Sequence, residues 1–114
     1  MSERRKELVR RYREAPRPAG VYRVRHTSSG RTLIGASPDA PAMLNRIRAQ
    51  LRMRGHPSRT LQADWAADGE GAFTFEVLDL LPVEGPREEP SARDLQTLLQ
   101  AWLEELDLNE EELY

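Results

Sequence analysis

The sequence predicts an α/β domain of the α+β type, with a three-stranded, largely antiparallel sheet flanked by helices. Two short segments, residues 20–27 and 31–36, are separated by a turn that contains Gly30 and are predicted to form a hairpin. A third segment, residues 72–81, alternates apolar and polar residues as a half-buried strand does. The other periodic segments repeat their apolar residues every three or four positions, which is typical of amphipathic helices.

The first expected helix covers residues 2–15. Ser2 is a candidate N-cap, three apolar residues form a narrow stripe, and prolines at positions 16 and 18 end the helix. We expect this basic helix and its proline linker, residues 1–18, to precede a single domain at 19–106. An acidic tail at 107–114 follows and is expected to be frayed.

Two helices are predicted between the hairpin and the third strand. The first begins after Asp39, runs to about Arg54 and stops at Gly55, because glycine commonly ends a helix. The second is the segment RTLQADWAAD, with Ser58 as its N-cap and Gly69 as its terminator.

A last helix follows the proline- and glutamate-rich segment 82–90. It begins after Ser91, where Asp94 three residues later resembles a capping box, and it ends near Leu106. Its apolar stripe consists of Leu95, Leu98, Leu99, Trp102 and Leu106.

The formal net charge of −2 hides a sharp division along the chain. Residues 1–59 carry 15 of the 17 basic residues and four acidic ones, whereas residues 60–114 carry two basic and 15 acidic residues. This asymmetry is compatible with an anionic partner for the first half. It is equally compatible with a fold in which the two halves pair with each other.

Several classes of protein are disfavoured by composition. The chain has no cysteine, which excludes disulfides, thiolate zinc sites and thiol nucleophiles, and it lacks the glycine loops of common nucleotide-binding motifs. Its two histidines, His26 and His56, make a weak metal site and lie in no recognisable nucleophile context. The N-terminus lacks the apolar core of a signal peptide, and no apolar run reaches membrane-spanning length. We therefore expect a cytoplasmic protein with no membrane association.

The hairpin carries a resemblance to a known family. Gly20-Val21-Tyr22 and Leu33-Ile34-Gly35, separated by 10 residues and followed by an arginine 11 positions after the second glycine, resemble the GIY-YIG nuclease domain. The likeness continues through residues 56–81, where His-x-x-x-x-Leu-Gln-x-x-Trp precedes Phe-x-Phe-Glu. It covers roughly residues 19–106.

This resemblance implies a DNA-cleaving domain that uses one divalent cation, Mg²⁺ or Mn²⁺ if the chain is active. It implies that Tyr22 lies near the attacking water and that Arg46 steadies the phosphate. Gly20 and Gly35 match the glycines of the two triplets, whose expected role is to let backbone or substrate approach closely.

Two positions depart from the family pattern. The second-triplet tyrosine is replaced by Leu33, which has no hydroxyl. The metal-binding glutamate is expected three residues before Trp102, and Leu99 stands there instead. Hard divalent cations need oxygen ligands, so no metal ligand is identified. A ligand recruited from elsewhere, such as Glu76, Glu104 or a partner chain, is the alternative.

The leading hypothesis is a GIY-YIG-like domain that binds nucleic acid, DNA more than RNA, and is weak or inactive as an endonuclease. One alternative is an active metal-dependent endonuclease. Another is a protein-interaction module that docks a protein partner through the acidic C-terminal half. The candidate nucleic-acid-binding residues are Arg23, Arg25, Arg48, Arg52 and Arg54.

Overall fold

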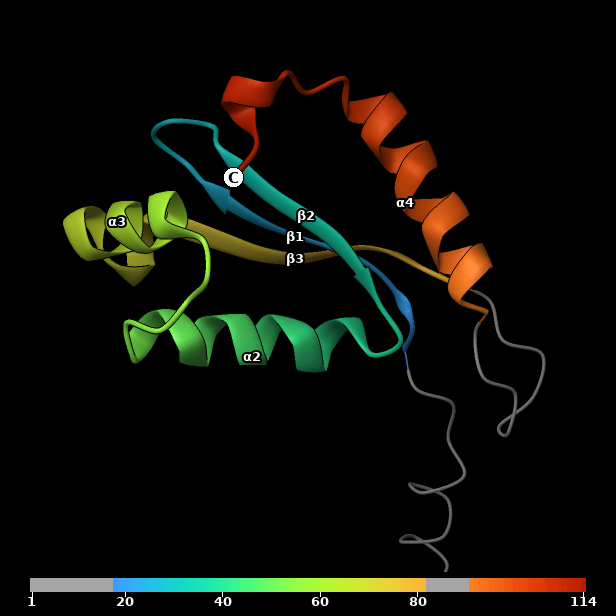
Figure 1. Ribbon diagram of the computed structural model, residues 1–114, viewed down its shortest axis with the longest axis horizontal. Helices are drawn as coiled ribbons and strands as arrows, with labels where there is room; N and C mark the ends of the chain where they lie inside the picture. Colours follow the sequence, from blue (N-terminus) through green and yellow to red (C-terminus); the bar gives the residue numbers. More distant parts are fainter. Residues whose placement is uncertain (1–17, 82–90) are drawn as a thin grey trace, which may run out of the picture.

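The computed structural model describes residues 18–81 and 91–114 as three strands and three α-helices with two short 3₁₀ turns (Figure 1). The predicted helix at 2–15 and the proline- and glutamate-rich segment 82–90 lie outside these residues. The elements are β1 (Gly20–His26), β2 (Thr32–Ser37), α2 (Ala40–Arg52), α3 (Arg59–Asp68), η1 (Glu70–Ala72), β3 (Phe73–Leu80), α4 (Ala92–Leu106) and η2 (Glu110–Glu112).

The sheet has the order β2-β1-β3, and both pairings are antiparallel. The predicted fold class is therefore confirmed. The predicted hairpin places β1 in the centre of the sheet, where Tyr22 pairs with Gly35 on one side and Val77 on the other. β2 and β3 form the two edges. A register shift between Val21 and Tyr22 interrupts the pairing with β3.

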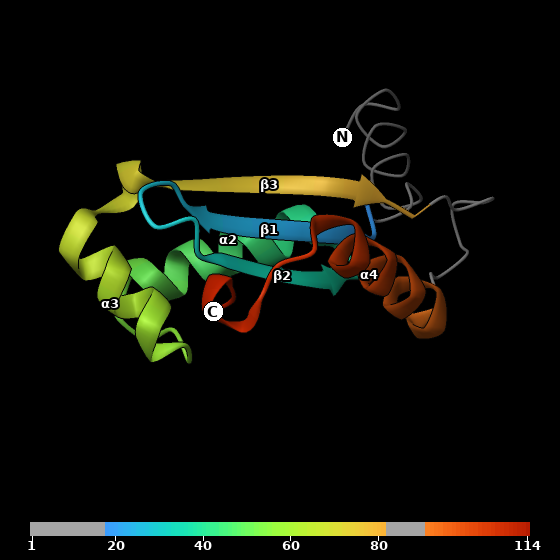
Figure 2. The ribbon, with the colours of Figure 1, turned by 90° about the horizontal axis from the view of Figure 1, so that it is seen from above.

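Helices cover the two faces of the sheet. Figure 1 shows α2 on one face and α4 on the other. Val24 of β1 belongs to the buried cluster under α2 and α3. Tyr22 packs against the same cluster, because alternate residues of a strand point to the same face. α4 packs on β1 and β2, and Figure 2 shows it at the β2 side of the sheet. The cluster under α2 and α3 consists of Val24, Leu44, Ile47, Leu51, Leu61, Trp65 and Phe73.

The predicted helix starts are confirmed by their caps. The Asp39 carboxylate accepts a hydrogen bond from the Ala42 amide, and the Ser58 hydroxyl accepts one from the Leu61 amide. Ser91 accepts hydrogen bonds from two amides of the first turn of α4. Each cap satisfies an amide that has no partner within its helix.

The end of α2 differs from the prediction. The helix ends at Arg52, and the left-handed residue is Arg54, with a φ of 60°, instead of Gly55. The Gly55 amide donates to the Gln50 carbonyl, and the Arg54 amide donates to the Leu51 carbonyl. These two bonds form a Schellman motif, in which the residue before Gly55 takes the left-handed conformation. Gly55 comes one position after the left-handed residue, so it does not remove the steric cost of that conformation at Arg54.

The expectation of a frayed C-terminal tail is wrong. Residues Glu110–Glu112 form η2, and the Asn109 side chain caps it by accepting a hydrogen bond from the Glu112 amide. Leu113 then forms a parallel bridge with Thr32, and the Tyr114 amide donates to the Thr32 carbonyl at 3.0 Å. The tail is ordered because it meets the open edge of β2, a partner that no local sequence pattern indicates.

Within the part of the chain that the structure describes, no helix is long and apolar enough to cross a membrane.

Candidate functional site

Tyr22 lies directly over Gly35. A Cβ atom at position 35 would stand 2.5 Å from the Tyr22 hydroxyl oxygen and 2.7 Å from Cζ. The hydroxyl end of the ring therefore lies over β2, which is an edge strand of the sheet. Only glycine at position 35 permits this placement. The group that approaches Gly35 is a side chain of the same sheet, whereas the prediction named backbone or substrate.

Burial raises the pKa of the half-buried Tyr22 hydroxyl. Desolvation disfavours the phenolate, so the group is protonated at neutral pH. It can donate a hydrogen bond to an anionic oxygen, or accept one from a water molecule.

Arg46 extends from the flank of α2 that faces β2. On the opposite flank, the Arg48 guanidinium lies 4.3 Å from the centre of the Phe75 ring in β3. Successive helix residues are separated by about 100°, so residues 46 and 48 point to opposite sides of the buried row that contains Ile47. Arg46 is exposed on the β2 side, the side reached by the Tyr22 hydroxyl.

Tyr22 and Arg46 also stand at similar heights along the sheet. The Ala40 amide donates to the Pro18 carbonyl, which joins the starts of α2 and β1. From that bond, Tyr22 lies four residues along the strand, about 13 Å, and Arg46 lies six residues along the helix, about 9 Å. The tyrosine and the arginine predicted to act together therefore belong to one side of the molecule.

The two departures from the family pattern lie on opposite faces of the sheet. Leu33 pairs with Val24 and packs against the cluster under α2, so it shares a face with Tyr22. Leu99 is half-buried on α4, which covers the other face. The Trp102 indole of that helix donates to the Asp79 carboxylate at 3.0 Å.

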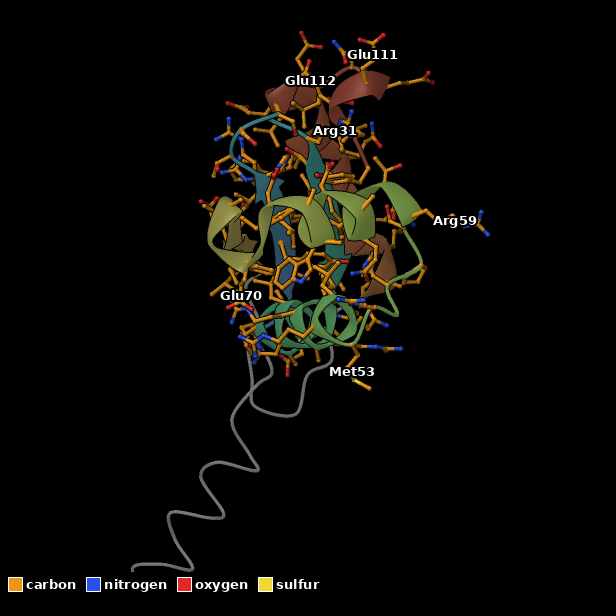
Figure 3. All side chains as sticks on the ribbon, turned by 90° about the vertical axis from the view of Figure 1, so that its left-hand side faces the viewer. Arg31, Met53, Arg59, Glu70, Glu111 and Glu112 are labelled. Carbon is orange, nitrogen blue, oxygen red and sulfur yellow. The ribbon has the colours of Figure 1, made fainter. Side chains whose placement is uncertain are left out.

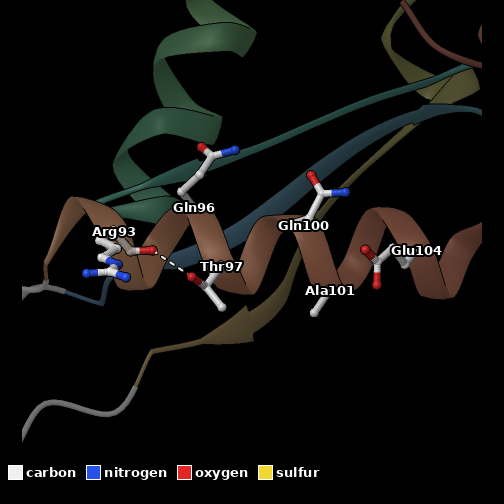
Figure 4. A pocket seen from close by; sticks show the side chains of 6 residues that line it. All are labelled: Arg93, Gln96, Thr97, Gln100, Ala101 and Glu104. Atoms are coloured by element: carbon white, nitrogen blue, oxygen red, sulfur yellow. Dashed lines mark hydrogen bonds between the residues drawn. The ribbon is translucent and has the colours of Figure 1, made fainter.

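The two carboxylates named as alternative metal ligands, Glu76 and Glu104, do not lie on the face of the sheet that carries Tyr22. Glu76 accepts hydrogen bonds from Arg23, including one from Nε at 3.1 Å, on the face away from Tyr22. Glu104 lies on the outward face of α4, where it lines a shallow open depression together with Arg93 (Figure 4). Among residues 18–81 and 91–114, no three His, Asp or Glu side chains are grouped so that they could hold a metal ion. The residues at the predicted site positions, Tyr22, Leu33, Arg46 and Leu99, include no carboxylate and therefore do not fit a divalent cation.

The structure separates the candidate nucleic-acid-binding arginines. Arg23 and Arg25 alternate with Tyr22 along β1 and so point to the opposite face. Arg48 and Arg52 lie on the β3 flank of α2, and Arg54 lies at its C-terminal end. They do not form a single cluster.

The two oppositely charged halves pair in part. Arg23 binds Glu76, the Arg52 Nε donates to Glu70 at 2.7 Å, and Arg31 stands 3.4 Å from an Asp64 oxygen. The fold therefore neutralises part of the positive charge of the first half. Arginines outside these ion pairs are the ones available to an anionic partner.

A second polar cluster surrounds His26, for which the sequence indicated only a weak metal site. Its side chain is 5% exposed, and its Nδ1 and Nε2 atoms lie 2.6 Å from the Ser29 hydroxyl and an Asp68 oxygen, respectively. The position of His26 on the inward side of β1, in phase with Val24, is the signal that could have predicted its burial. Its ring stacks on Phe73 with centroids 4.8 Å apart. This cluster joins the hairpin turn to α3.

Gln62 is another residue whose role sequence reasoning missed. Its amide nitrogen donates to the Leu51 carbonyl at 3.0 Å, and its Oε1 accepts a hydrogen bond from the His56 amide at 3.1 Å. The His56 Nδ1 atom in turn accepts a hydrogen bond from the Ser58 amide. The Leu-Gln-x-x-Trp motif therefore has a structural function: it fixes the connection between α2 and α3.

Comparisons with known proteins support the fold through structure and not through sequence. No protein-family model matches the chain, and no curated protein matches it in sequence. Two solved structures match in three dimensions. A glutamate-to-alanine mutant of the catalytic domain of intron endonuclease I-TevI has a TM-score of 0.62 and 20% identity, and it covers 79% of this chain and 84% of that one. The catalytic domain of homing endonuclease I-TevI has the same TM-score and identity, over 78% and 88% of the two chains.

These neighbours are GIY-YIG nuclease domains. The resemblance predicted from the two triplets is therefore confirmed at the level of the fold. At 20% identity the likeness shows the arrangement of the elements and does not show the chemistry of the site.

Proposed function

We propose that this chain is a DNA-binding domain on a GIY-YIG nuclease fold, with weak or no endonuclease activity of its own. The observation that carries the proposal is the placement of the Tyr22 hydroxyl over Gly35 on the side of α2 that bears Arg46. A neutral hydroxyl donor and an arginine are groups that bind a phosphodiester. The fold likeness to endonuclease catalytic domains supports DNA as the source of that phosphodiester.

The proposal of weak or absent cleavage rests on the donor set. In-line attack on a phosphodiester needs an activated water and compensation for the charge that develops on the phosphoryl oxygens. Tyr22 and Arg46 supply a hydrogen bond and one positive charge. Leu33 and Leu99 supply neither, and Glu76 is already engaged by Arg23. These residues retain the means to bind a phosphate and lack the means to bind a cation beside it.

DNA binding can be tested by gel shift with a duplex at increasing salt. The wild-type chain should bind at low salt and lose affinity as salt rises, because arginine-phosphate contacts release counterions. Arg46→Ala should weaken binding more than Arg93→Ala, which removes the same charge from the outward face of α4. An absence of binding at the lowest salt would contradict the proposal.

Cleavage can be tested separately with supercoiled plasmid and Mg²⁺ or Mn²⁺. We expect the plasmid to remain intact or to be nicked only at high protein concentration. Tyr22→Phe keeps the ring over Gly35 and removes only the hydroxyl, so it separates packing from chemistry. Efficient nicking that is lost in Tyr22→Phe and Arg46→Ala would instead favour the active endonuclease.

The protein-interaction alternative has less support. Its proposed docking segment includes the acidic tail, and the tail contacts β2 of the same chain. The Tyr114 hydroxyl also donates to an Asp64 oxygen at 2.6 Å. A partner that binds Leu113 and Tyr114 would have to displace the bridge to Thr32 and the hydrogen bond to Asp64.

A further inference from the structure

The arginines of α2 and the following connection divide into two groups. Residues 40–63 contain five arginines and no acidic residue. Arg48 and Arg52 face β3: one covers the Phe75 ring, and the other forms two hydrogen bonds with Glu70, from Nε and from one terminal nitrogen. Both side chains therefore contact the β3 side of the same chain, although the buried Nε of Arg48 has no hydrogen-bond partner among the residues described. The other three are Arg46, Arg54 and Arg59, for which the described part of the chain shows no ion pair.

The second group follows the β2 side of the molecule. Arg46 and Gln50 share one flank of α2 at i, i+4 spacing, and Arg54 follows two residues after the last residue of the helix. Arg59 begins α3. Figure 3 looks along the sheet and shows Glu70 on one side and Arg59 on the other, with Met53 near the base. We call Arg46, Gln50, Arg54 and Arg59 the basic track.

Arg54 has a conformation that favours a different residue. Its φ of 60° is left-handed, which glycine adopts without a steric penalty and arginine does not. Glycine follows immediately at position 55, where the φ is not positive. Nothing in the packing explains an arginine here, since its side chain is exposed and makes no ion pair with the residues described. A strained residue that does not contribute to packing is a candidate for function.

The connection that carries Arg54 and Arg59 is held in place. Gln62 binds the carbonyl of Leu51 and the amide of His56, and His56 accepts from the Ser58 amide. These hydrogen bonds tie the connection to the end of α2 and to the start of α3. The two arginines are therefore presented from a fixed backbone, which lowers the entropy lost when they bind a ligand.

We infer that a DNA duplex runs along the basic track, from the Tyr22 hydroxyl past Arg46 and Arg54 to Arg59. The inference rests on the proposed function and assigns its binding surface. From Arg46 to its last residue, Arg52, the helix advances about 9 Å, which corresponds to two or three phosphates of one strand at about 3.4 Å each, and Arg54 lies beyond that end. Arg48 and Arg52, which were candidate DNA contacts, lie outside this path.

Negative charge on the α4 and tail side of the molecule limits where the DNA duplex can lie. Figure 3 shows Glu111 and Glu112 at the end of the molecule opposite Met53. Together with Glu104 on the outward face of α4, they make the α4 and tail side repulsive to phosphate. The duplex therefore lies on the α2 side of the sheet.

The test is a fluorescence anisotropy titration of a labelled duplex with single arginine-to-glutamine variants. Arg54→Gln and Arg59→Gln should each weaken binding about fivefold and lower the salt slope by about one, as the loss of a phosphate contact does. Arg93→Gln, with the same change of net charge on the α4 side, should bind as the wild type does. Equal affinities for the three variants, with a wild type that binds, would overturn the track and leave the proposed function standing. A wild type that does not bind would overturn both.

Arg54→Gly provides an independent readout. It relieves the left-handed arginine, so Tm should rise by several degrees while DNA affinity falls as it does in Arg54→Gln. A rise in Tm with unchanged DNA affinity would overturn the inference that the left-handed Arg54 contacts DNA. Since the variant is expected to be more stable than the wild type, a loss of binding cannot be attributed to unfolding.

Discussion

The Tyr22 ring lies across Gly35 at a separation that leaves no room for a Cβ atom. Tyr22 is the last residue of the first triplet, Gly35 is the last residue of the second, and antiparallel pairing places them opposite each other. The spacing of the two triplets is thus explained by contact within the sheet. One strand contributes a ring that reaches the edge, and the other contributes the space for it.

Gly35→Ala should displace Tyr22 at a modest cost in stability. The new methyl group meets the far end of a side chain, which can rotate away, so we expect a loss of about 1–2 kcal/mol in the free energy of unfolding. DNA affinity should fall together with the displaced hydroxyl. Urea unfolding and anisotropy titration measure the two effects. Gly71→Ala is the matched control, because its Cβ would meet open space. Equal behaviour of the two variants would contradict the contact.

Gly20→Ala should be more damaging to the fold than Gly35→Ala. A Cβ at position 20 would overlap the Asp79 carbonyl oxygen, which is backbone of the neighbouring strand and cannot rotate away. We expect a loss of about 3 kcal/mol or more, typical of overpacking in a buried site. Urea unfolding of the two variants side by side gives the order. A Gly20→Ala protein as stable as Gly35→Ala would show that β1 and β3 can separate at this point.

Leu99→Glu tests whether this position is the vacant ligand site of the fold. A carboxylate in the half-buried stripe of α4 should lower the stability by about 2–3 kcal/mol without a metal ion. Because α4 covers the face opposite Tyr22, Mg²⁺ or Mn²⁺ should leave the Tm of the variant unchanged. A cation bound between position 99 and Tyr22 would raise it, because a ligand that binds only the folded state stabilises it. Thermal unfolding with and without the cation measures both.

The matched control for Leu99→Glu is Gln100→Glu. It adds the same charge one residue later, on the outward face of α4. It should not show the loss. A Tm of Leu99→Glu that rises with the cation would contradict this expectation and show that position 99 reaches the site beside Tyr22.

Tyr114→Phe should loosen the tail and change the response of the protein to alkaline pH. The substitution removes the hydrogen bond from the Tyr114 hydroxyl to Asp64, at a cost of about 1 kcal/mol. Burial and the Asp64 carboxylate raise the pKa of Tyr114 above its ordinary value of 10.0. The unfolded chain therefore loses this proton first, and the contribution of Tyr114 to stability falls as pH rises above about 10.

Urea unfolding at pH 8 and above pH 10 checks this sign. The wild type should lose more stability than Tyr114→Phe between the two conditions. If both proteins lose the same amount, Tyr114 does not carry the alkaline effect. Tyr22, whose pKa is also raised by burial, would then be its source.

Gln62→Glu should destabilise the connection between α2 and α3. The carboxylate can still accept from the His56 amide, but it cannot donate to the Leu51 carbonyl and instead places two oxygens against each other. We expect a loss of about 1–3 kcal/mol, as for a buried carbonyl left without its partner. Urea unfolding measures it, with Gln96→Glu on the outward face of α4 as the charge control. Equal stability of the two variants would show that Gln62 does not clamp the connection.

Local signals predicted most of the fold. The caps at Asp39, Ser58 and Ser91 act between residues two or three positions apart, and the strand and helix periods are read within a single segment. The start of each described helix was therefore predicted correctly. The end of α2 was not, because glycine preference pointed to Gly55, whereas the hydrogen bonds of the helix end require a left-handed residue at position 54.

Local sequence signals were enough to predict the order of the elements, the antiparallel hairpin and the pair of triplets that resembles a nuclease site. The partners of the arginines and the position of the tail depend on contacts between segments that are distant in the sequence. Glu76 is 53 residues from Arg23, and Glu70 is 18 residues from Arg52, so no local pattern couples them. The docking of Tyr114 on Thr32 depends on an unpaired strand edge, which exists only after the sheet has formed. Periodicity and capping act within a few residues, whereas ion pairs and edges are made by distant segments brought together by folding.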